Sequence, residues 1–436
     1  MKSQPACVCV CVVLCGDTKM KNESNYNKLT RNPLRIYLLG VVILITSCVN
    51  LDEDPPSILV PNNFFGTVEN VEAGVSSAFS KYHASLVTTQ SFVAQVGADD
   101  ITTHKASNKQ DFREFDSFNA SAGNNWMAQW KWNPLWKSIL SANAVVNGWE
   151  NVSGTTEEIE TLVKPTAAMA YFIRALAYFD LVRLWGGLPL ITEETTGEEV
   201  RSPVEEVYDL IISDLEFAEK YLPYQWEDGS GIGKPTKWAA KALLAQVYLT
   251  NAGWPIKDKN MYVRAAEKAK EVIDSGEFSL EENFADLWRE ENGSSQEGVF
   301  VIRMCDPCAN VPGAWASGAK TNFYKVGFAS SEMGGGFEDL LGEIRFFNDF
   351  PEGPRKDATY ITEVDGVQWE DLQSGRPLIA KYGPGLGSIW DTTNEDIYIS
   401  RYADVLLIYA EATNKATGNP TAESYTALNA VRRRAG

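Results

Sequence analysis

Histidine is the scarcest reactive residue of this chain, since only His83 and His104 occur in 436 residues. Serine-protease-type triads and most zinc sites depend on histidine, so both kinds of centre are nearly excluded. The HExxH, GxSxG, GxxxxGK(S/T) and EF-hand patterns are also missing from the sequence. The sequence therefore indicates no catalytic residue, no metal site and no cofactor.

Basic residues are also in the minority, with 39 Lys and Arg against 58 Asp and Glu and a formal charge of −19. Residues 1–47 contain six of the basic and two of the acidic residues, so the remainder of the chain carries −23. A polyanion repels phosphate backbones unless it has a local basic patch, and we find none. We predict that the protein does not bind nucleic acid.

Cysteine is sparse, and four of its seven occurrences fall within the first 15 positions, at Cys7, Cys9, Cys11 and Cys15. A metal site is one interpretation, but alternating Cys-Val spacing matches no zinc pattern and no histidine lies near. We instead interpret Met20 as the true start and residues 1–19 as an over-extended reading frame. These four cysteines would then be absent from the mature protein.

Residues 1–47 are interpreted as a signal segment, because residues 20–48 have the parts of a secretion signal. A basic region at 21–35 precedes an apolar run at 36–45, which is shorter than the roughly 20 residues that a membrane-spanning helix needs. Ile45-Thr46-Ser47-Cys48 then resembles the lipobox of bacterial lipoproteins, in which the cysteine is acylated and becomes the first residue. An ordinary signal peptide with an incidental cysteine is the alternative.

Cys48 is therefore the predicted lipid anchor, and several acyl chains would hold the protein on a membrane where one chain is marginal. Residues 48–66 are acidic and rich in proline, which is typical of an exposed tether. Cys305 and Cys308 form the remaining CxxC motif. It suits a redox centre, half a zinc site or a small structural loop, and in an exported protein we favour a local disulfide.

Residues 67–296 show mostly helical periodicity, with apolar residues at intervals of three and four. Residues 165–185 give the strongest pattern, which predicts one apolar face containing Ala170, Ile173, Ala177 and Leu181. Gly186 ends this predicted helix. Ser202 is the predicted N-cap of the next helix, with Pro203 in its first turn.

Two later segments, 236–253 and 261–276, repeat the same apolar spacing of 4, 3 and 4 residues. Together they span about one 34-residue helical-hairpin period, with alanines where tetratricopeptide repeats place small residues. Amphipathic helices packed together without repeat stacking are the alternative. Residues 401–436 form a similar C-terminal pair, which we expect to be truncated. The predicted fold is mainly α, a tetratricopeptide-like superhelix of helical hairpins.

Residues 297–400 form a loop-rich region in which helical periodicity mostly lapses. "GVFVIR" indicates a short strand, and the Gly-rich stretches indicate loops. Long irregular segments inside a compact domain usually carry function. We therefore predict that this region, with a few short strands, binds the ligand.

Several segments resemble the SusD/RagB family of outer-membrane lipoproteins. The similarity is carried by "AYFIRALAYFDLVRLWGGLPLIT", "SPVEEVYDLIISDLEFAEKYLP", "GKPTKWAAKALLAQVYLTNAGWP", "AAEKAKEVIDSGEFSL" and "ISRYADVLLIYAEATNK" with "LNAVRRRAG". The resemblance runs from about Cys48 to the last residue. It implies a surface-exposed outer-membrane protein of starch or polysaccharide utilisation, which binds glycan, or in some members peptide, and delivers it to a TonB-dependent transporter.

In this family, ligand contacts come mainly from the loop after the first helix and from the loops that follow the central strand. Segments 99–125 and 305–330 occupy those places here. By position, the resemblance implies the aromatic contacts Phe115, Trp315, Tyr324 and Trp390, and the polar partners Asp100, Asn108 and Asn322. Aromatic faces suit sugar C–H groups, and amides and carboxylates suit the hydroxyls.

Two other classes of function compete with glycan capture. A surface glycoside hydrolase needs two carboxylates facing each other across a cleft. Acidic pairs such as Glu193-Glu194 are common in this sequence, but solvated surface explains them. A scaffold that binds only other proteins is the second competitor. We predict a non-enzymatic binding protein.

The lipobox interpretation predicts the behaviour of a Cys48→Ser variant. Without the acylated thiol, the protein should be released, or should remain uncleaved in the inner membrane, while its ligand affinity is unchanged. Fractionation of cells and metabolic labelling with a fatty acid measure both outcomes. A variant that is still acylated and surface-bound would contradict the interpretation.

Overall fold

The computed structural model describes residues 64–86, 95–104, 109–119, 125–193, 195, 197–226, 233–288, 295–303, 339–380 and 396–436. Cys48 and the disulfide candidates Cys305 and Cys308 lie outside these residues. Helices dominate the described residues, which confirms the predicted mainly α class. Within this part of the chain, every helix is too short or too polar to cross a bilayer.

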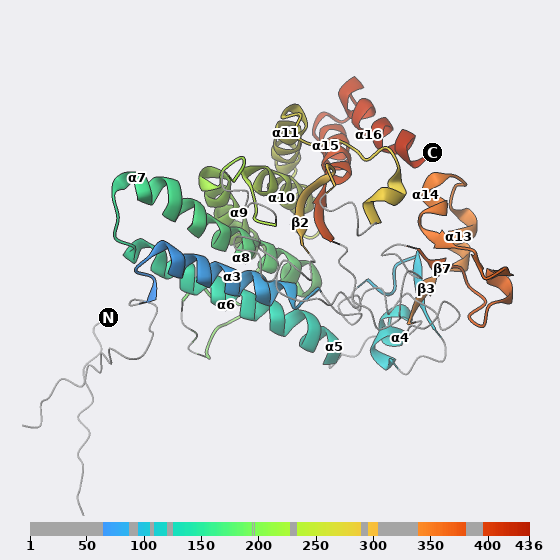
Figure 1. The fold of residues 1–436 in the computed structure, drawn as a ribbon, viewed down its shortest axis with the longest axis horizontal. Coiled ribbons are helices and arrows are strands. Elements are labelled where there is room, and N and C mark those ends of the chain that lie inside the picture. Colours follow the sequence, from blue (N-terminus) through green and yellow to red (C-terminus); the bar gives the residue numbers. More distant parts are fainter. Residues whose placement is uncertain are drawn as a thin grey trace, which may run out of the picture. The chain divides into compact units, whose positions relative to one another are not determined.

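The long helices pack in the order in which they follow along the chain. They are α3 (Val68–His83), α6 (Asn133–Gly148), α8 (Lys164–Trp185), α9 (Val204–Tyr221), α10 (Lys237–Asn251), α11 (Met261–Asp274), α15 (Tyr402–Thr417) and α16 (Ala422–Ala435). Each packs against the next, from α3 on α6 to α15 on α16, and the helices are seen side by side in Figure 1. This stacking agrees with the predicted tetratricopeptide-like superhelix.

Shorter helical segments connect the long helices. They are α4 (Gln110–Asp116), α5 (Asn125–Met127), α7 (Thr156–Glu158), α13 (Ile344–Asp349) and α14 (Pro354–Asp357), with π-helical turns η3 (Ala128–Trp132) and η5 (Ile159–Val163) and 3-10 turns η4 (Trp149–Asn151), η6 (Phe284–Trp288) and η10 (Trp369–Asp371). Here η3 leads directly into α6, and η5 leads into α8.

The strands of the described residues form small antiparallel pairs. They are β1 (Ile101–Thr103) with β3 (Leu340–Gly342), β2 (Gly298–Ile302) with β8 (Ile397–Arg401), β4 (Tyr360–Ile361) with β7 (Leu378–Ile379), and β5 (Glu363–Val364) with β6 (Val367–Gln368). The expected strand at "GVFVIR" is therefore confirmed as β2. In Figure 1, β3, β7, α13 and α14 lie to one side of the long helices, with α14 beside the C-terminal end of α16.

Helix α8 is the centre of the main hydrophobic core, and it is buried on every side except in its last turn. The predicted face of Ala170, Ile173 and Ala177 is fully buried, but so are Phe172 and Phe179 on other sides. The predicted face is therefore confirmed, and burial extends beyond it to other sides of the helix. Neighbouring helices α3, α6 and α9 all pack against α8, so its surface meets protein rather than water.

The predicted capping of α9 was wrong. Pro203 occupies the N-cap position, the helix begins at Val204, and no side chain caps it. The Ser202 N–H instead donates to the Leu188 carbonyl at 2.8 Å, next to a bridge between Pro189 and Arg201. This tertiary pairing holds the chain extended before the helix, and it overrides the local capping preference of serine.

A buried ion pair joins three of the core helices. The Arg174 guanidinium of α8 donates two hydrogen bonds of 2.7 Å to Asp214 of α9 and one of 2.9 Å to the Asn143 side-chain oxygen of α6. Burial alone would lower the pKa of Arg174, but the bonds to Asp214 and its charge outweigh burial and raise it. The pair therefore fixes the register of α8 between α6 and α9.

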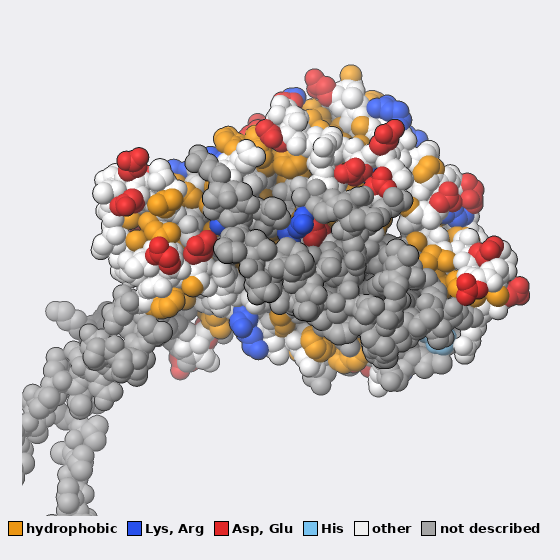
Figure 2. Space-filling model, viewed as in Figure 1, with side chains coloured by type: hydrophobic (Ala, Val, Ile, Leu, Met, Phe, Trp, Pro, Cys, Tyr) orange, Lys and Arg blue, Asp and Glu red, His pale blue; other side chains and the backbone are white. Residues whose placement is uncertain are grey.

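The molecular surface reflects the acidic composition. On the face drawn in Figure 2, acidic side chains gather at several places on the described surface. Some of the lysine and arginine that does occur is used inside the fold, as with Arg174, which pairs with Asp214, and with Lys241, which lies between Glu219 and Glu271. A ligand that carries negative charge would therefore need a local cation at its site.

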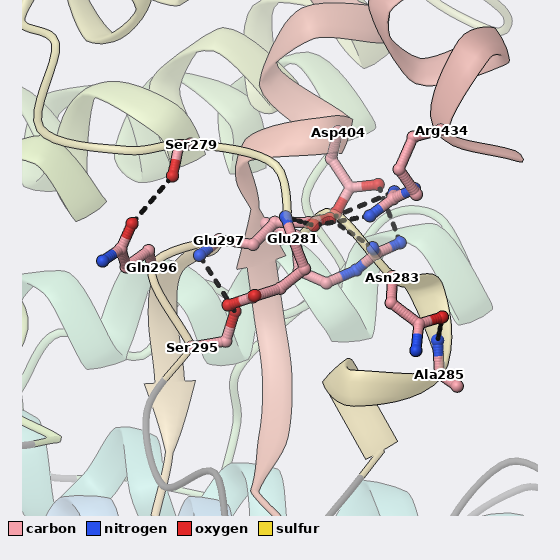
Figure 3. A network of polar contacts seen from close by, with 10 residues as sticks. Ser279, Glu281, Asn283, Ala285, Ser295, Gln296, Glu297, Asp404 and Arg434 are labelled. Carbon is pink, nitrogen blue, oxygen red and sulfur yellow. Dashed lines mark hydrogen bonds and ion pairs between the residues drawn. The ribbon is translucent and has the colours of Figure 1, made fainter.

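A second buried charge, Glu297, ties the C-terminal helices to the strand pair β2–β8. Its side chain is 0% exposed and accepts hydrogen bonds of 2.7 Å from Arg401 and from Arg434. Figure 3 shows Arg434 reaching this carboxylate. The Glu281 N–H adds a bond of 3.1 Å, and the Glu297 carbonyl accepts the Tyr402 N–H at 2.8 Å. The carboxylate is thus saturated by donors from three separate segments.

We expect a Glu297→Gln variant to lose about 3–5 kcal/mol of unfolding free energy, because two partly buried guanidinium groups lose the fully buried carboxylate that pairs with them. Urea denaturation of the full chain measures the change. The matched control is Glu267→Gln on the exposed side of α11, which should stay within about 0.5 kcal/mol of the unchanged protein. Equal effects of the two variants would contradict this role of Glu297.

Candidate functional site

A cavity of about 470 Å³ lies between the segment that follows α3 and helix α13. Its size suits a small ligand or one end of a larger one. The lining combines aromatic rings, carboxylates and one guanidinium group, contributed by Gly97, Ala98, Asp99, Ile101, Asp116, Phe118, Glu343, Arg345, Phe346 and Asp349.

The pairing of β1 with β3 brings the two walls of this cavity together. Ile101 lies opposite Gly342, and the pairing is extended by a hydrogen bond of 3.1 Å from the Glu343 N–H to the Asp100 carbonyl. An ion pair of 2.6 Å between Lys109 and Asp339 adds a second link between the same segments. Residues about 240 positions apart in the sequence thus form one site.

Asp116 fixes the first wall, because it ends α4 and points back at β1. Its Oδ2 accepts hydrogen bonds from the Thr102 hydroxyl at 2.9 Å, the Thr103 hydroxyl at 3.0 Å and the Thr103 N–H at 3.2 Å. Three donors hold this carboxylate in one orientation. The same contacts anchor the C-terminal end of α4, which presents the next residues to the cavity.

Phe118 is the most unusual residue of the site. It follows α4 with a φ of +54°, and its N–H donates to the Phe115 carbonyl at 3.0 Å while the Asn119 N–H donates to the Glu114 carbonyl at 2.8 Å. These two bonds form a Schellman motif, whose left-handed position usually holds glycine.

A left-handed conformation costs a phenylalanine about 1–2 kcal/mol. Burial does not offset this cost, because the ring is 85% exposed. Backbone strain that is not offset by burial of the side chain is often found at functional sites. The ring of Phe118 is a free aromatic face beside a polar cavity.

Helix α13 supplies the opposite wall. Phe347 is its buried anchor, with its ring 5.0 Å from that of Tyr360, and Phe346 packs edge-on against Phe350 at 5.6 Å. This packing leaves Arg345 and Asp349 exposed toward solvent at the cavity. Burial, with a smaller contribution from the charge of Asp100, raises the pKa of Tyr360 to about 12, so the phenol beneath this wall is neutral.

Chemically, this arrangement suits a polyhydroxylated ligand. The Phe118 ring offers a flat apolar face, and Asp99, Asp349 and Arg345 offer exposed acceptors and donors. Among the described residues, no cluster of three or more His, Cys, Asp or Glu side chains could hold a metal ion.

Of the residues predicted from the sequence, the described part of the chain includes Asp100 and Phe115. Asp100 is exposed, and Phe115 is partly buried against the cluster around Phe112. Neither lines the cavity, but their neighbours Asp99 and Asp116 do. The other candidates lie outside the described residues, namely Asn108, Trp315, Asn322, Tyr324 and Trp390.

Sequence reasoning missed the contribution of α13. Arg345, Phe346 and Asp349 lie in a stretch that reads as loop, because the helix has only six residues and follows a Gly-rich run. Its two consecutive phenylalanines flanked by charges were the available signal. Phe118 lies within the predicted segment 99–125, but its left-handed backbone is visible only in the structure.

Comparisons with known proteins agree with this fold. A family model described as starch-binding and associating with the outer membrane matches residues 50–249, and the SusD family model matches residues 380–436. The two matches together cover more than half of the chain, which belongs to the SusD family. This confirms the resemblance seen in the sequence.

Individual relatives support the assignment. A SusD-like protein of Formosa agariphila is 28% identical over 435 residues, covering 92% of this chain and 81% of its own. The crystal structure of a SusD superfamily protein from Parabacteroides distasonis is 25% identical, with a TM-score of 0.72 over 84% of this chain and 80% of that one. A laminarin-binding SusD-like protein shares the fold, with 21% identity and a TM-score of 0.70 over 85% of each chain.

Gly97 provides a test of how the first wall is built. Its φ is +100°, and a Cβ there would lie 2.8 Å from the Phe115 carbonyl oxygen that accepts the Phe118 N–H. Gly97→Ala should therefore destabilise the protein by more than about 1 kcal/mol, as measured by urea denaturation.

The matched control is Gly66→Ala, because a Cβ at Gly66 meets no described atom within 4 Å. We expect this variant to change the unfolding free energy by less than about 0.5 kcal/mol. If Gly97→Ala were as harmless as the control, the close approach to Phe115 would not constrain the wall.

Proposed function

We propose that this protein is a non-enzymatic, cell-surface binding protein for oligosaccharides. The observation that carries the proposal is the exposed, left-handed Phe118 beside a cavity with acidic and guanidinium groups. Sugar rings stack their C–H faces on aromatic rings, while their hydroxyls bond to carboxylates and to arginine. Membership of a family described as starch-binding supports the same class of ligand.

A structural neighbour whose ligand is known adds further support. The laminarin-binding neighbour has the same fold, and laminarin is a glucan. Because its identity to this chain is low, it supports only the class of ligand that we propose and not the particular sugar. A peptide ligand, the alternative considered from the sequence, has no specific support in the described residues.

The state of the carboxylates favours binding over hydrolysis. Glycoside hydrolysis needs two carboxyl groups that are free to act as acid and as base or nucleophile. Asp116 already accepts three hydrogen bonds, and Glu343 is paired with Arg376 at 3.2 Å. Two of the acidic groups at the cavity are therefore engaged in holding the walls.

The proposal places the protein at the outer membrane, anchored through an acylated Cys48 and exposed at the cell surface. There it would deliver glycan to a TonB-dependent outer-membrane transporter. The description of the matched family as associating with the outer membrane supports this location. Copurification of a transporter with the tagged full chain from solubilised outer membranes tests the partnership.

The main experiment incubates the purified protein with a panel of oligosaccharides that includes laminarin fragments. Isothermal titration calorimetry measures binding, and chromatography of the same mixtures detects products. Binding without product release is the expected result. Release of shorter sugars would overturn the non-enzymatic proposal, and absence of binding to every glycan would overturn the ligand class.

We expect Phe118→Ala to weaken binding of the best oligosaccharide by about tenfold or more, because an aromatic anchor is lost. The thermal midpoint should be unchanged, since the exposed ring contributes little packing. Phe118→Trp should retain binding because it keeps an aromatic face.

The control is Tyr425→Ala on α16. This tyrosine is also an exposed aromatic residue, with 53% of its surface accessible, and it does not line the cavity. It should leave the affinity unchanged. Equal losses in the Phe118 and Tyr425 variants, or no loss in either, would exclude Phe118 as the stacking platform.

A further inference from the structure

A second cavity, of about 420 Å³, is lined by residues of α3, η3, α8, α10 and β8. It shares no lining residue with the cavity at Phe118. Its walls mix apolar side chains, such as Leu176 and Ile397, with the amides of Gln95 and Gln246 and a small group of charges.

Lys131 is unusual in this cavity because it is a buried lysine without a bonded acidic partner among the described residues. It lies in the π-helical turn η3, is only 7% exposed and lines the cavity. Among the described residues, its ammonium group has neither a hydrogen-bond partner nor an ion-pair partner. Buried charges in proteins are normally paired, and π-helical turns occur frequently at functional sites.

Asp180 is the carboxylate whose charge attracts Lys131, and it is already hydrogen-bonded to other residues. Its two oxygens accept hydrogen bonds of 2.7 Å from the Tyr82 hydroxyl and 2.6 Å from Arg183. Arg183 also lies over the Phe179 ring at 4.2 Å, which fixes it in place. The described residues that line the cavity thus include two cations and one anion, and the anion is already bonded to Arg183.

Lys131 keeps its charge in this environment. Burial lowers its pKa to about 8, with the attraction of Asp180 opposing and the repulsion of Arg183 adding to that shift. At pH 7 a group with such a pKa is still mostly protonated. The only carboxylate whose charge acts on this buried ammonium group in the described lining is Asp180, and Asp180 is bonded to Tyr82 and Arg183 rather than to Lys131.

We propose that this cavity is a second binding site, for a saccharide that carries one anionic group, with the Lys131 ammonium as its counter-charge. A carboxylate or a sulfate ester supplies the missing negative charge. The amides of Gln95 and Gln246 suit the hydroxyl groups, and the apolar walls suit the ring carbons. The saccharide part rests on the proposed function, whereas the anion part rests on Lys131 itself.

The acidic surface makes this selectivity depend on one residue. A chain of formal charge −19 repels anionic sugars in general, so a local cation is needed to hold one. Lys131 is placed inside a cavity, where a charge-assisted bond is stronger than it is at the surface.

The experiment titrates the full chain with glucuronate, galactose 6-sulfate and neutral galactose by calorimetry. We expect at least one of the two charged sugars to bind and neutral galactose to bind at least tenfold more weakly. Which charged sugar binds identifies the anionic group. Failure of both to bind, or equal binding of galactose, would overturn the proposal.

Lys131→Met then removes the charge with little change in length. It should weaken binding of the charged sugar by about tenfold or more, as expected for loss of a charge-assisted hydrogen bond. The matched control, Lys137→Met on the exposed side of α6, should bind normally. Equal affinity of the Lys131 variant and the unchanged protein would overturn the assignment.

Two further readouts keep the result interpretable. Without ligand, the thermal midpoint of Lys131→Met should be equal to or higher than that of the unchanged protein, because an uncompensated buried charge is removed. A large fall would mean that Lys131 is structural and would overturn the proposal. Phe118→Ala should leave charged-sugar binding intact, so a failure here is distinguishable from a failure of the proposed glycan site.

Discussion

The buried carboxylate of Glu297 is the contact on which the C-terminal half of the structure depends. It joins the start of β2 to Arg401, at the end of β8, and to Arg434, near the end of α16. Because β2 also packs against α10, this one group couples the strand pair to the helical stack. Each of the charges would be costly to bury alone, so the three segments are stable only when they are assembled together.

The stack and the site follow different physical rules. The helices bury apolar side chains continuously, with Arg174 and Asp214 fixing their register, so they form a rigid scaffold. The cavity at Phe118 is held instead by hydrogen bonds to Asp116 and by the short β1–β3 pair. Phe118, Arg345 and Asp349 are exposed at this cavity, so they can be substituted to test the proposed site while the core stays intact.

The sequence was sufficient for the helices because their apolar periodicity is local information. Val71, Val75 and Phe79 on α3 are buried as their spacing predicts, and the strand β2 was also found. The errors occurred where tertiary contacts decide. Ser202 does not cap α9, because its backbone N–H bonds to the Leu188 carbonyl instead. The spacing of apolar residues in the Ala-rich α8 did not indicate that its other sides are also buried.

For the site, we expected the segment after α3 to contribute, but the contribution of α13 depends on a strand pair between distant parts of the sequence. The burial of Lys131 was equally invisible, because lysine is normally a surface residue.

The β1–β3 pair determines when the cavity at Phe118 can form during synthesis and export of the chain. The first wall of the cavity is complete in sequence by Phe118, yet its partner strand begins only at Leu340. A chain that is still being synthesised or exported therefore has no cavity at Phe118 until more than two hundred further residues have followed. The binding site that we propose at Phe118 is therefore completed only late, after most of the helical scaffold has been made.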